Sequence, residues 1–248
     1  MAALKTVPLK LPATIDDLRK LEIGTVTYLT GRIFTAREGV YKHAIEAGMP
    51  ASKEALGLVN FHCSPAARIN PDGTYSVGAI ASAPMEDPED VPPHALANAK
   101  PGYTVSAVSA TASFRFVKWL DRWFKLSGCN IIIGKGGMTS EVYRSVFVPN
   151  EVIYLTTVGY GTGALLGRGI KHVAGVYWLD ELGLAQAVWV LDVENFGPFL
   201  VESDLAGNSL FERENAKIAP GIEKLYVGTR PATMRRYGET DDKTQEVI

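Results

Sequence analysis

Short apolar runs alternate with amphipathic segments along most of this 248-residue chain, and glycine closes several of the amphipathic segments. The run TVTYLTGRIFT at 25–35 alternates and is rich in β-branched and aromatic residues, which predicts a strand. The following segment, AREGVYKHAIEAG at 36–48, predicts a helix that ends at Gly48. Because further pairs of this kind follow, we predict an α/β or mixed α+β domain whose loops converge at one edge.

The remaining elements are predicted from the same two patterns. We expect further strands at 56–62, 104–110, 129–133, 152–158 and 173–178, and further helices at 15–21, 113–125, 140–147, 162–170 and near Leu184. The turn-rich stretch at 64–76 predicts a hairpin or a long loop.

The domain boundaries are predicted from composition. Residues 78–103 contain five prolines and an acidic cluster, which indicates a surface excursion or flap inserted into the domain. The charged end of the chain indicates a polar extension. We therefore predict one domain over residues 1–227, with 78–103 inserted in it, and a C-terminal extension over 228–248.

Charge and hydropathy exclude several classes of protein. The chain has 25 basic and 27 acidic side chains, a net charge of −2, so it offers no footprint for binding nucleic acid. It contains neither an apolar run of 18 residues nor a secretory signal, which predicts a cytoplasmic protein without a membrane span.

Metal ligands are sparse in the sequence. Cys63 and Cys129 form no CxxC pair and belong to no three-cysteine set, so any metal chemistry must use ligands from another chain. The four histidines show no HxH or HExxH spacing, and we expect each of them to be packed, capping or exposed.

Two glycine-rich turns invite a nucleotide-binding interpretation that their spacing does not support. In GYGTG at 159–163 the third glycine comes one residue early for GxGxxG, so a tight strand-to-helix turn is the simpler interpretation. GKGG at 134–137 lacks the first glycine and the Ser or Thr of a phosphate loop. What it retains is Lys135, held between glycines after a buried strand, where its ammonium can face an anion.

Two other turns place a cation at the start of a helix. Thr111 and Arg115 occur in SATASFR, and Arg37 occurs in the similar arrangement TAR at 35–37. A carboxylate is favoured at such a position, although a plain cap with a solvated arginine is the alternative. Arg37, Arg115 and Lys135 together could bind a small dicarboxylate.

Five blocks of sequence carry a family resemblance: YLTGRIFTAR at 28–37, FHCSP at 61–65, SATASFR at 109–115, IIIGKGGM at 131–138, and DELG with VWVLDVENFGP within 180–198. In this order they resemble the beta subunit of the two-subunit, iron–sulfur-dependent class I fumarases and L(+)-tartrate dehydratases. FHCSP, GKGGM and ENFGP lean toward the tartrate dehydratase branch.

The resemblance implies a swivelling β/β/α domain and a hetero-oligomer in which the alpha subunit, rather than this chain, holds the 4Fe-4S cluster. It implies that Arg37, Arg115 and Lys135 bind the carboxylates of a C4 dicarboxylate, and it makes Thr111 a candidate general base. The implied reaction is that of a hydro-lyase, converting fumarate to malate or L-tartrate to oxaloacetate. In the chemistry that the resemblance implies, the cluster held by the alpha subunit would supply a Lewis acid for the departing hydroxyl, and a base would remove the proton from the adjacent carbon.

Departures from the family pattern leave alternatives open. The Asp and His that usually follow the first arginine are replaced in the segment 37–43, and Phe114 is bulkier than the usual residue beside Arg115. A non-catalytic assembly or regulatory paralogue, or a hydro-lyase for a different, bulkier hydroxy acid, would fit these changes. An enzyme that acts alone would need a complete active site within this chain.

Overall fold

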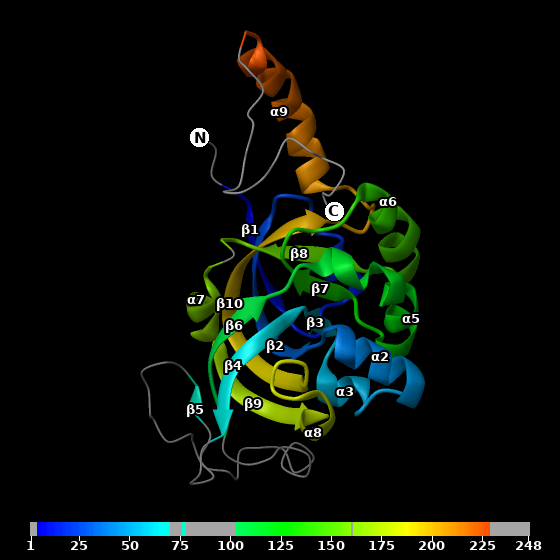
Figure 1. Cartoon of the computed structure of the whole chain (residues 1–248), viewed down its shortest axis with the longest axis vertical. Coiled ribbons are helices and arrows are strands. Elements are labelled where there is room, and N and C mark those ends of the chain that lie inside the picture. The colour runs from blue at the N-terminus through cyan, green and yellow to red at the C-terminus, as the bar shows by residue number, and fades with distance from the viewer. Residues whose placement is uncertain (1–3, 70–75, 78–102, 160, 229–248) are drawn as a thin grey trace, which may run out of the picture. The chain divides into compact units, whose positions relative to one another are not determined.

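The computed structural model describes residues 4–69, 76–77, 103–159 and 161–228 (Figure 1). The predicted excursion at 78–103 and the predicted extension at 228–248 lie almost entirely outside these residues. Within them, helices flank a core that is rich in β-sheet. The prediction of a mixed α/β fold is therefore confirmed.

In the described part of the chain, seven strands form one mixed sheet in the order β1-β2-β3-β7-β8-β10-β9. The first five run parallel to their neighbours, whereas β10 runs antiparallel to β2, β8 and β9. The strands are β1 (Thr6–Lys10), β2 (Val26–Thr35), β3 (Val59–Phe61), β7 (Ile131–Gly134), β8 (Ile153–Thr157), β9 (Ile170–Tyr177) and β10 (Val188–Ser203). Sequence reasoning predicts β2, β3, β7, β8 and β9 with ends shifted by a few residues, and misses β1 and β10.

Strand β10 closes the sheet into a ring. It is 16 residues long and pairs with β2 along one edge and with β8 along the other, so that Phe199 is opposite both Thr27 and Thr157. The ring β2-β3-β7-β8-β10 thus returns to β2 without an open edge. Sequence reasoning misses β10 because a glycine and a proline interrupt its alternating pattern. The structure accommodates this interruption by register shifts between Val193 and Phe196 and between Phe196 and Phe199.

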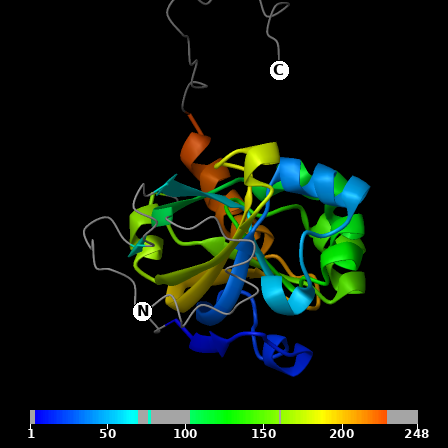
Figure 2. The same ribbon diagram turned by 90° about the horizontal axis from the view of Figure 1, so that it is seen from below.

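Successive residues of the central strands contribute to two apolar clusters. On β7, Ile131 and Ile133 belong to one cluster and Ile132 to the other, because side chains alternate across a strand. The second cluster includes Tyr41 of α2 and Trp123 of α5, whose ring centroids are 4.3 Å apart. Figures 1 and 2 show both helices on the same side of the sheet. This packing anchors the two helices that follow the segments with Arg37 and with Thr111 and Arg115.

Up to residue 211, the helices of the described ranges are mostly short. They are α1 (Ile15–Leu18), α2 (Glu38–Ala47), α3 (Lys53–Leu56), α5 (Val117–Ser127), α6 (Ser140–Val142), α7 (Gly163–Gly167) and α8 (Leu179–Leu182). The 3₁₀ turn η2 (Ser113–Phe116) precedes α5, and α6 continues into the π-helical turn η3 (Tyr143–Phe147) and the 3₁₀ turn η4 (Val148–Asn150). Thr14 caps α1 in a capping box with Asp17, which confirms the predicted start of that helix.

Helix α7 explains the glycines of the GYGTG region. It is much shorter than the helix predicted at 162–170, and it packs against β6 (Tyr103–Ala110). A Cβ atom at Gly163 would lie 2.5 Å from the Val108 carbonyl oxygen, and one at Gly167 would lie 2.3 Å from the Ser106 carbonyl oxygen. Close backbone packing requires these glycines, in agreement with the simpler interpretation of the turn.

A second sheet has the order β4-β6-β5, with β4 at Cys63–Ile69 and β5 at Ser76–Val77. Both strands pair with β6, from opposite sides, and do not pair with each other. The prediction of a hairpin or long loop at 64–76 is therefore wrong for 64–69, which belong to β4, whereas residues 70–75 lie outside the described residues. The partner strand lies more than 30 residues further along the chain, where a local turn signal gives no information about it.

The chain divides into two compact units, Met1–Phe211 and Glu212–Ile248. Helix α9 (Leu210–Tyr226), which sequence reasoning does not predict, provides most of the described part of the second unit. It exposes Ile218, Ile222 and Leu225. The predicted boundary at residue 227 stays a prediction.

Candidate functional site

The predicted anion-binding residues of the larger sheet lie at the carboxyl ends of neighbouring parallel strands. Arg37 comes two residues after β2, and Lys135 directly follows β7. Between β2 and β7 lies β3, which His62 follows. Because the carboxyl ends of adjacent parallel strands share one edge of a sheet, these residues belong to the same edge.

Thr111 joins this edge from the smaller sheet. It follows β6; its backbone N–H donates to the His62 carbonyl at 2.6 Å, and its own carbonyl accepts from the Lys135 N–H at 3.2 Å. Ala112 forms a parallel bridge with Lys135. The structure therefore brings Thr111 and Lys135 together. The Thr111 side chain is buried, and its hydroxyl makes no hydrogen bond with the residues described.

Arg115 lies on the same turn as Thr111 and is exposed to solvent. Its guanidinium carbon is 5.6 Å from the centre of the Phe116 ring. The Lys42 ammonium is the main cause that holds the pKa of Glu38 below its usual value, and the charge of Arg115 adds to this effect. Arg115 is thus within electrostatic reach of the start of α2, directly after Arg37.

Arg37 is half-buried, and polar groups of neighbouring segments hold its side chain. Its Nη1 donates to Ser64 Oγ and to the Ala185 carbonyl, the latter at 3.2 Å. Ser64 is opposite Ser109 in the smaller sheet, two residues before Thr111. The structure therefore places Arg37 at the shared edge, with part of its guanidinium already bound to the protein.

Two different structural constraints require glycine in the GKGG turn. Gly136 and Gly137 have φ angles of 84° and 82°, in the left-handed region that favours glycine. At Gly134 the constraint is space, because a Cβ atom would lie 2.0 Å from Ser113 Oγ and 2.6 Å from Tyr154 Oη. The turn is consequently built for one backbone path, which presents the lysine between its glycines.

A buried carboxyl supports the end of this turn. The Tyr143 hydroxyl accepts a hydrogen bond from the Met138 N–H at 2.9 Å, and Ser209 Oγ donates to Glu202 Oε1 at 2.7 Å. A Cβ atom at Gly137 would lie 3.1 Å from the Glu202 carboxyl carbon. Burial raises the pKa of Glu202, and hydrogen bonds from the Tyr143 and Ser209 hydroxyls offset only part of the increase.

Sequence reasoning misses Glu202 and Tyr143. The only local signal is an acidic residue inside the apolar run FLVES at 199–203, which indicates burial but no partner.

The sequence predicts that each histidine is packed, capping or exposed, and His62 is packed and fully buried. Its hydrogen-bond partners come from other segments of the chain.

The described residues do not fit an iron–sulfur cluster or another metal. They contain no group of three His, Cys, Asp or Glu side chains arranged to bind an ion. Cys63 and Cys129 are free and buried, and burial raises the pKa of Cys63 and raises that of Cys129 to about 12. Because a thiolate is the form that binds a metal, neither thiol is suited to hold a cluster.

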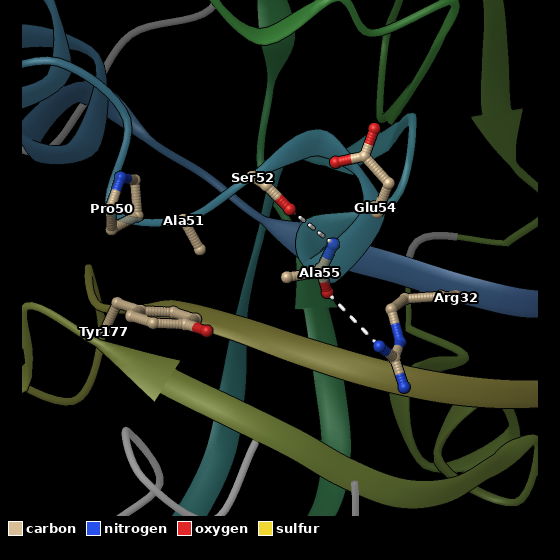
Figure 3. Close-up of a pocket in the computed structure, with 7 residues that line it drawn as sticks. All are labelled: Arg32, Pro50, Ala51, Ser52, Glu54, Ala55 and Tyr177. Atoms are coloured by element: carbon tan, nitrogen blue, oxygen red, sulfur yellow. Dashed lines mark hydrogen bonds between the residues drawn. The ribbon is translucent and has the colours of Figure 1, made fainter. Parts of the chain in front are cut away.

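A pocket of about 460 Å³ lies elsewhere, beside α3 (Figure 3). Its arginine, Arg32, forms a bidentate pair with Asp192, with nitrogen–oxygen distances of 2.7 and 3.0 Å. This pairing satisfies the guanidinium within the protein. The pocket is lined by Arg32, Pro50, Ala51, Ser52, Glu54, Ala55 and Tyr177, and it contains none of the predicted site residues.

Comparison with known proteins gives a family whose members match most of the chain. The family model described as "Fumarase C-terminus" matches residues 94–214. A Methanocaldococcus jannaschii protein named "Putative L(+)-tartrate dehydratase subunit beta" is 34% identical over 212 residues, which cover 86% of this chain and 94% of that protein. The L(+)-tartrate dehydratase subunit beta of Escherichia coli is 27% identical over 220 residues, which cover 88% and 90%.

A third relative is much longer than this chain. The Geobacillus stearothermophilus protein named "Putative fumarate hydratase class I" is 26% identical over 208 residues, which cover 84% of this chain and 34% of that protein. These matches identify the class as the iron–sulfur class I hydro-lyases. The chain belongs to the family of beta subunits of class I fumarases and L(+)-tartrate dehydratases.

No helix within the described ranges combines the length and the apolar character needed to cross a membrane.

The buried Glu202 predicts a pH dependence of stability. Its pKa in the native state is raised above the ordinary value of 4.5, which we take for the unfolded state. Between the unfolded-state pKa and the native-state pKa, the native state therefore binds more protons than the unfolded state. The unfolding free energy therefore falls as pH rises through this window. We expect urea titrations from pH 4 to pH 8 to show this fall for the wild type relative to Glu202→Gln, and parallel curves would contradict it.

Proposed function

We propose that this chain is the beta subunit of an iron–sulfur hydro-lyase that reversibly adds water to, or removes it from, a C4 dicarboxylate. The reaction is fumarate to malate, or L-tartrate to oxaloacetate. The observation that carries the proposal is the meeting of the Thr111 and Lys135 segments through backbone hydrogen bonds, with Arg115 on the same turn. Membership of the family supports it independently.

The three cations provide the charge needed for a substrate with two carboxylates. Among the residues described, no acidic side chain forms an ion pair with Arg37, Arg115 or Lys135. Their charges are therefore available for an anion, and guanidinium groups bind carboxylates with two parallel hydrogen bonds. Ser64 and Ala185 orient Arg37 while leaving part of its guanidinium for the ligand.

We assign to Thr111 the movement of the proton in this reaction. In the elimination direction, a base takes a proton from one carbon and the C–H electron pair forms the double bond. The hydroxyl on the neighbouring carbon leaves with the C–O electron pair and takes up one proton to become water, so the net loss is one H₂O. A free threonine hydroxyl is too weakly acidic to act as this base at neutral pH, so a group from the partner must activate it. The absence of an internal hydrogen bond to the described residues leaves the hydroxyl available for such a group.

The partner is an alpha subunit that holds the 4Fe-4S cluster, and the assembly is a hetero-oligomer. This division is supported by the lack of cluster ligands among the described residues. It is also supported by the longer class I relative, of which this chain matches only 34%. We assign to this chain the swivelling β/β/α fold of such subunits, which the closed ring of strands and its flanking helices support. We also propose a cytoplasmic location.

The first test is assembly. Because the described residues offer no cluster ligands, we expect the chain purified alone to be colourless and inactive, and co-expression with a three-cysteine alpha subunit to give a brown, oxygen-sensitive complex. The complex should be tested on fumarate, malate and L-tartrate. Activity of the isolated, iron-free chain would contradict the division of roles, and a cluster-loaded complex inactive on all three would favour the regulatory alternative or a bulkier substrate.

The second test concerns the cations. Loss of a charge-assisted contact to a carboxylate in a desolvated site costs about 2–4 kcal/mol, or roughly 30- to 1,000-fold in catalytic efficiency. We expect Arg115→Ala or Lys135→Ala in the complex to raise KM and lower kcat/KM by this amount without unfolding it. Lys125→Ala is the matched control, because Lys125 is exposed and paired with Asp121. Wild-type kinetics in both site variants would remove these residues from the site.

The third test separates two roles of Thr111. The following turn η2 has no side-chain cap hydrogen bond, so the capping role considered for Thr111 is not supported. If its hydroxyl only packs in the core, Thr111→Ala should leave kcat nearly intact. If it moves the proton, Thr111→Ala should lower kcat by about 100-fold or more with little change in Tm, and Thr111→Ser should retain part of the rate. Unchanged turnover in Thr111→Ala would remove this hydroxyl from the proton transfer.

A further inference from the structure

A chain of buried polar side chains runs through the core next to the edge that carries the candidate site. The Tyr154 hydroxyl donates to Ser113 Oγ at 2.7 Å, and Ser113 Oγ is 2.7 Å from His62 Nδ1. On the other side of the imidazole, Nε2 is hydrogen-bonded to the Tyr41 hydroxyl, which donates to Asn60 Oδ1 at 2.7 Å. All five side chains are fully buried.

The protons of this chain have one consistent order. Burial lowers the pKa of His62 to about 3, so the imidazole is neutral and has one donor and one acceptor nitrogen. Tyr41 donates to Asn60 and must therefore accept from His62 Nε2–H. This leaves Nδ1 as the acceptor for the Ser113 hydroxyl, whose oxygen accepts from Tyr154. Each link then uses one donor and one acceptor.

Ser113 connects the chain to the turn that carries the candidate proton-transfer and carboxylate-binding residues. It stands between Thr111 and Arg115, at the first position of η2. His62 holds this turn a second time, because its carbonyl accepts from the Thr111 N–H at 2.6 Å. The side chain and the backbone of one histidine thus hold the same turn at two points.

The ends of the chain reach the other two segments of the site. The Tyr154 hydroxyl is 3.4 Å from the Lys135 carbonyl, and it fills the space that a Cβ atom at Gly134 would need. Tyr41 lies on α2, four residues after Arg37, and its own N–H donates to the Arg37 carbonyl at 3.0 Å. The hydrogen-bonded chain therefore links all three segments that carry the predicted cations.

A requirement for stability alone does not account for this arrangement. Buried polar groups cost free energy unless each of them is hydrogen-bonded, and apolar side chains of similar volume could fill the same space. Every link of the chain is made, and within it only the Asn60 side-chain amide nitrogen has no hydrogen-bond partner among the described residues. Such a chain differs from an apolar core in that it tolerates one geometry. The 111–115 turn, which is neither a strand nor an α-helix, needs such an external constraint.

We propose that Tyr41, His62, Ser113 and Tyr154 form a positioning network that holds the 111–115 turn against the Lys135 turn, so that Thr111 and Arg115 face the same ligand. The catalytic consequence rests on the proposed function. The order of the two turns is a property of the fold and can be measured without a substrate.

The kinetic test uses the cluster-loaded complex with Ser113→Ala and Tyr154→Phe, each of which removes one hydroxyl and little volume. We expect each variant to lower kcat/KM by about tenfold or more through both kcat and KM, because misplaced groups lose effective concentration. The control is Ser127→Ala, which removes a buried serine hydroxyl that donates to the Trp123 carbonyl at 2.8 Å. It should lower Tm by a similar amount and keep wild-type kinetics.

The combined variant Ser113→Ala/Tyr154→Phe tests whether the residues act as one unit. Within a network, its loss of kcat/KM should be close to that of the more damaging single variant, whereas independent residues would give the product of the two losses. If Ser113→Ala does not assemble, Tyr154→Phe and the exchange measurement below still decide.

Amide hydrogen exchange provides the measurement that needs no substrate. We expect the Thr111 and Lys135 amides, which donate to the His62 and Thr111 carbonyls, to exchange faster in Ser113→Ala and Tyr154→Phe than in Ser127→Ala. Wild-type exchange and wild-type kinetics in both variants would overturn the network. Faster exchange in a complex that has no hydro-lyase activity would support the network and reject the proposed function.

Discussion

The pairing of β10 with both β2 and β8 is the interaction on which the rest of this structure depends. One antiparallel strand satisfies the backbone groups at two edges of a parallel sheet, and the sheet closes. Closure sets the order β2-β3-β7 at the opposite part of the ring, and it thereby brings the segments after these strands to a common edge. Without that order, Arg37, His62 and Lys135 would be distant points on the chain.

The charges and the polar core at this edge are separated in a way that suits an anion site. Arg115 is exposed and Lys135 half-buried, and neither is paired with a described acidic residue. Behind them, His62 is uncharged and Glu202 is buried under the glycine turn. Positive charge therefore faces outward, where a carboxylate and the partner we propose can reach it, while uncharged hydrogen bonds maintain the geometry.

Local patterns predict the elements whose causes are local. The alternation at 25–35 and the glycine at 48 lead to β2 and α2 with nearly correct ends, and the hydroxyls and cations of SATASFR and GKGG identify turns that do meet. The failures involve pairing over long distances. β4 finds its partner in β6, and the interrupted pattern of β10 becomes a strand only because two neighbours accept its bulges.

The sequence by itself determined most of the parallel strands and the turns after them, the positions of the three cations and of Thr111, and, through five blocks of residues, the family. These depend on propensities and on residue identities, which are properties of short segments. The tertiary structure alone decided that His62 hydrogen-bonds to Ser113 and Tyr41, and that Glu202 lies beneath the glycine turn. The physical reason is that a buried polar group is defined by its partners. The partners of His62 lie 21 and 51 residues away along the chain, and only the closed sheet brings them together.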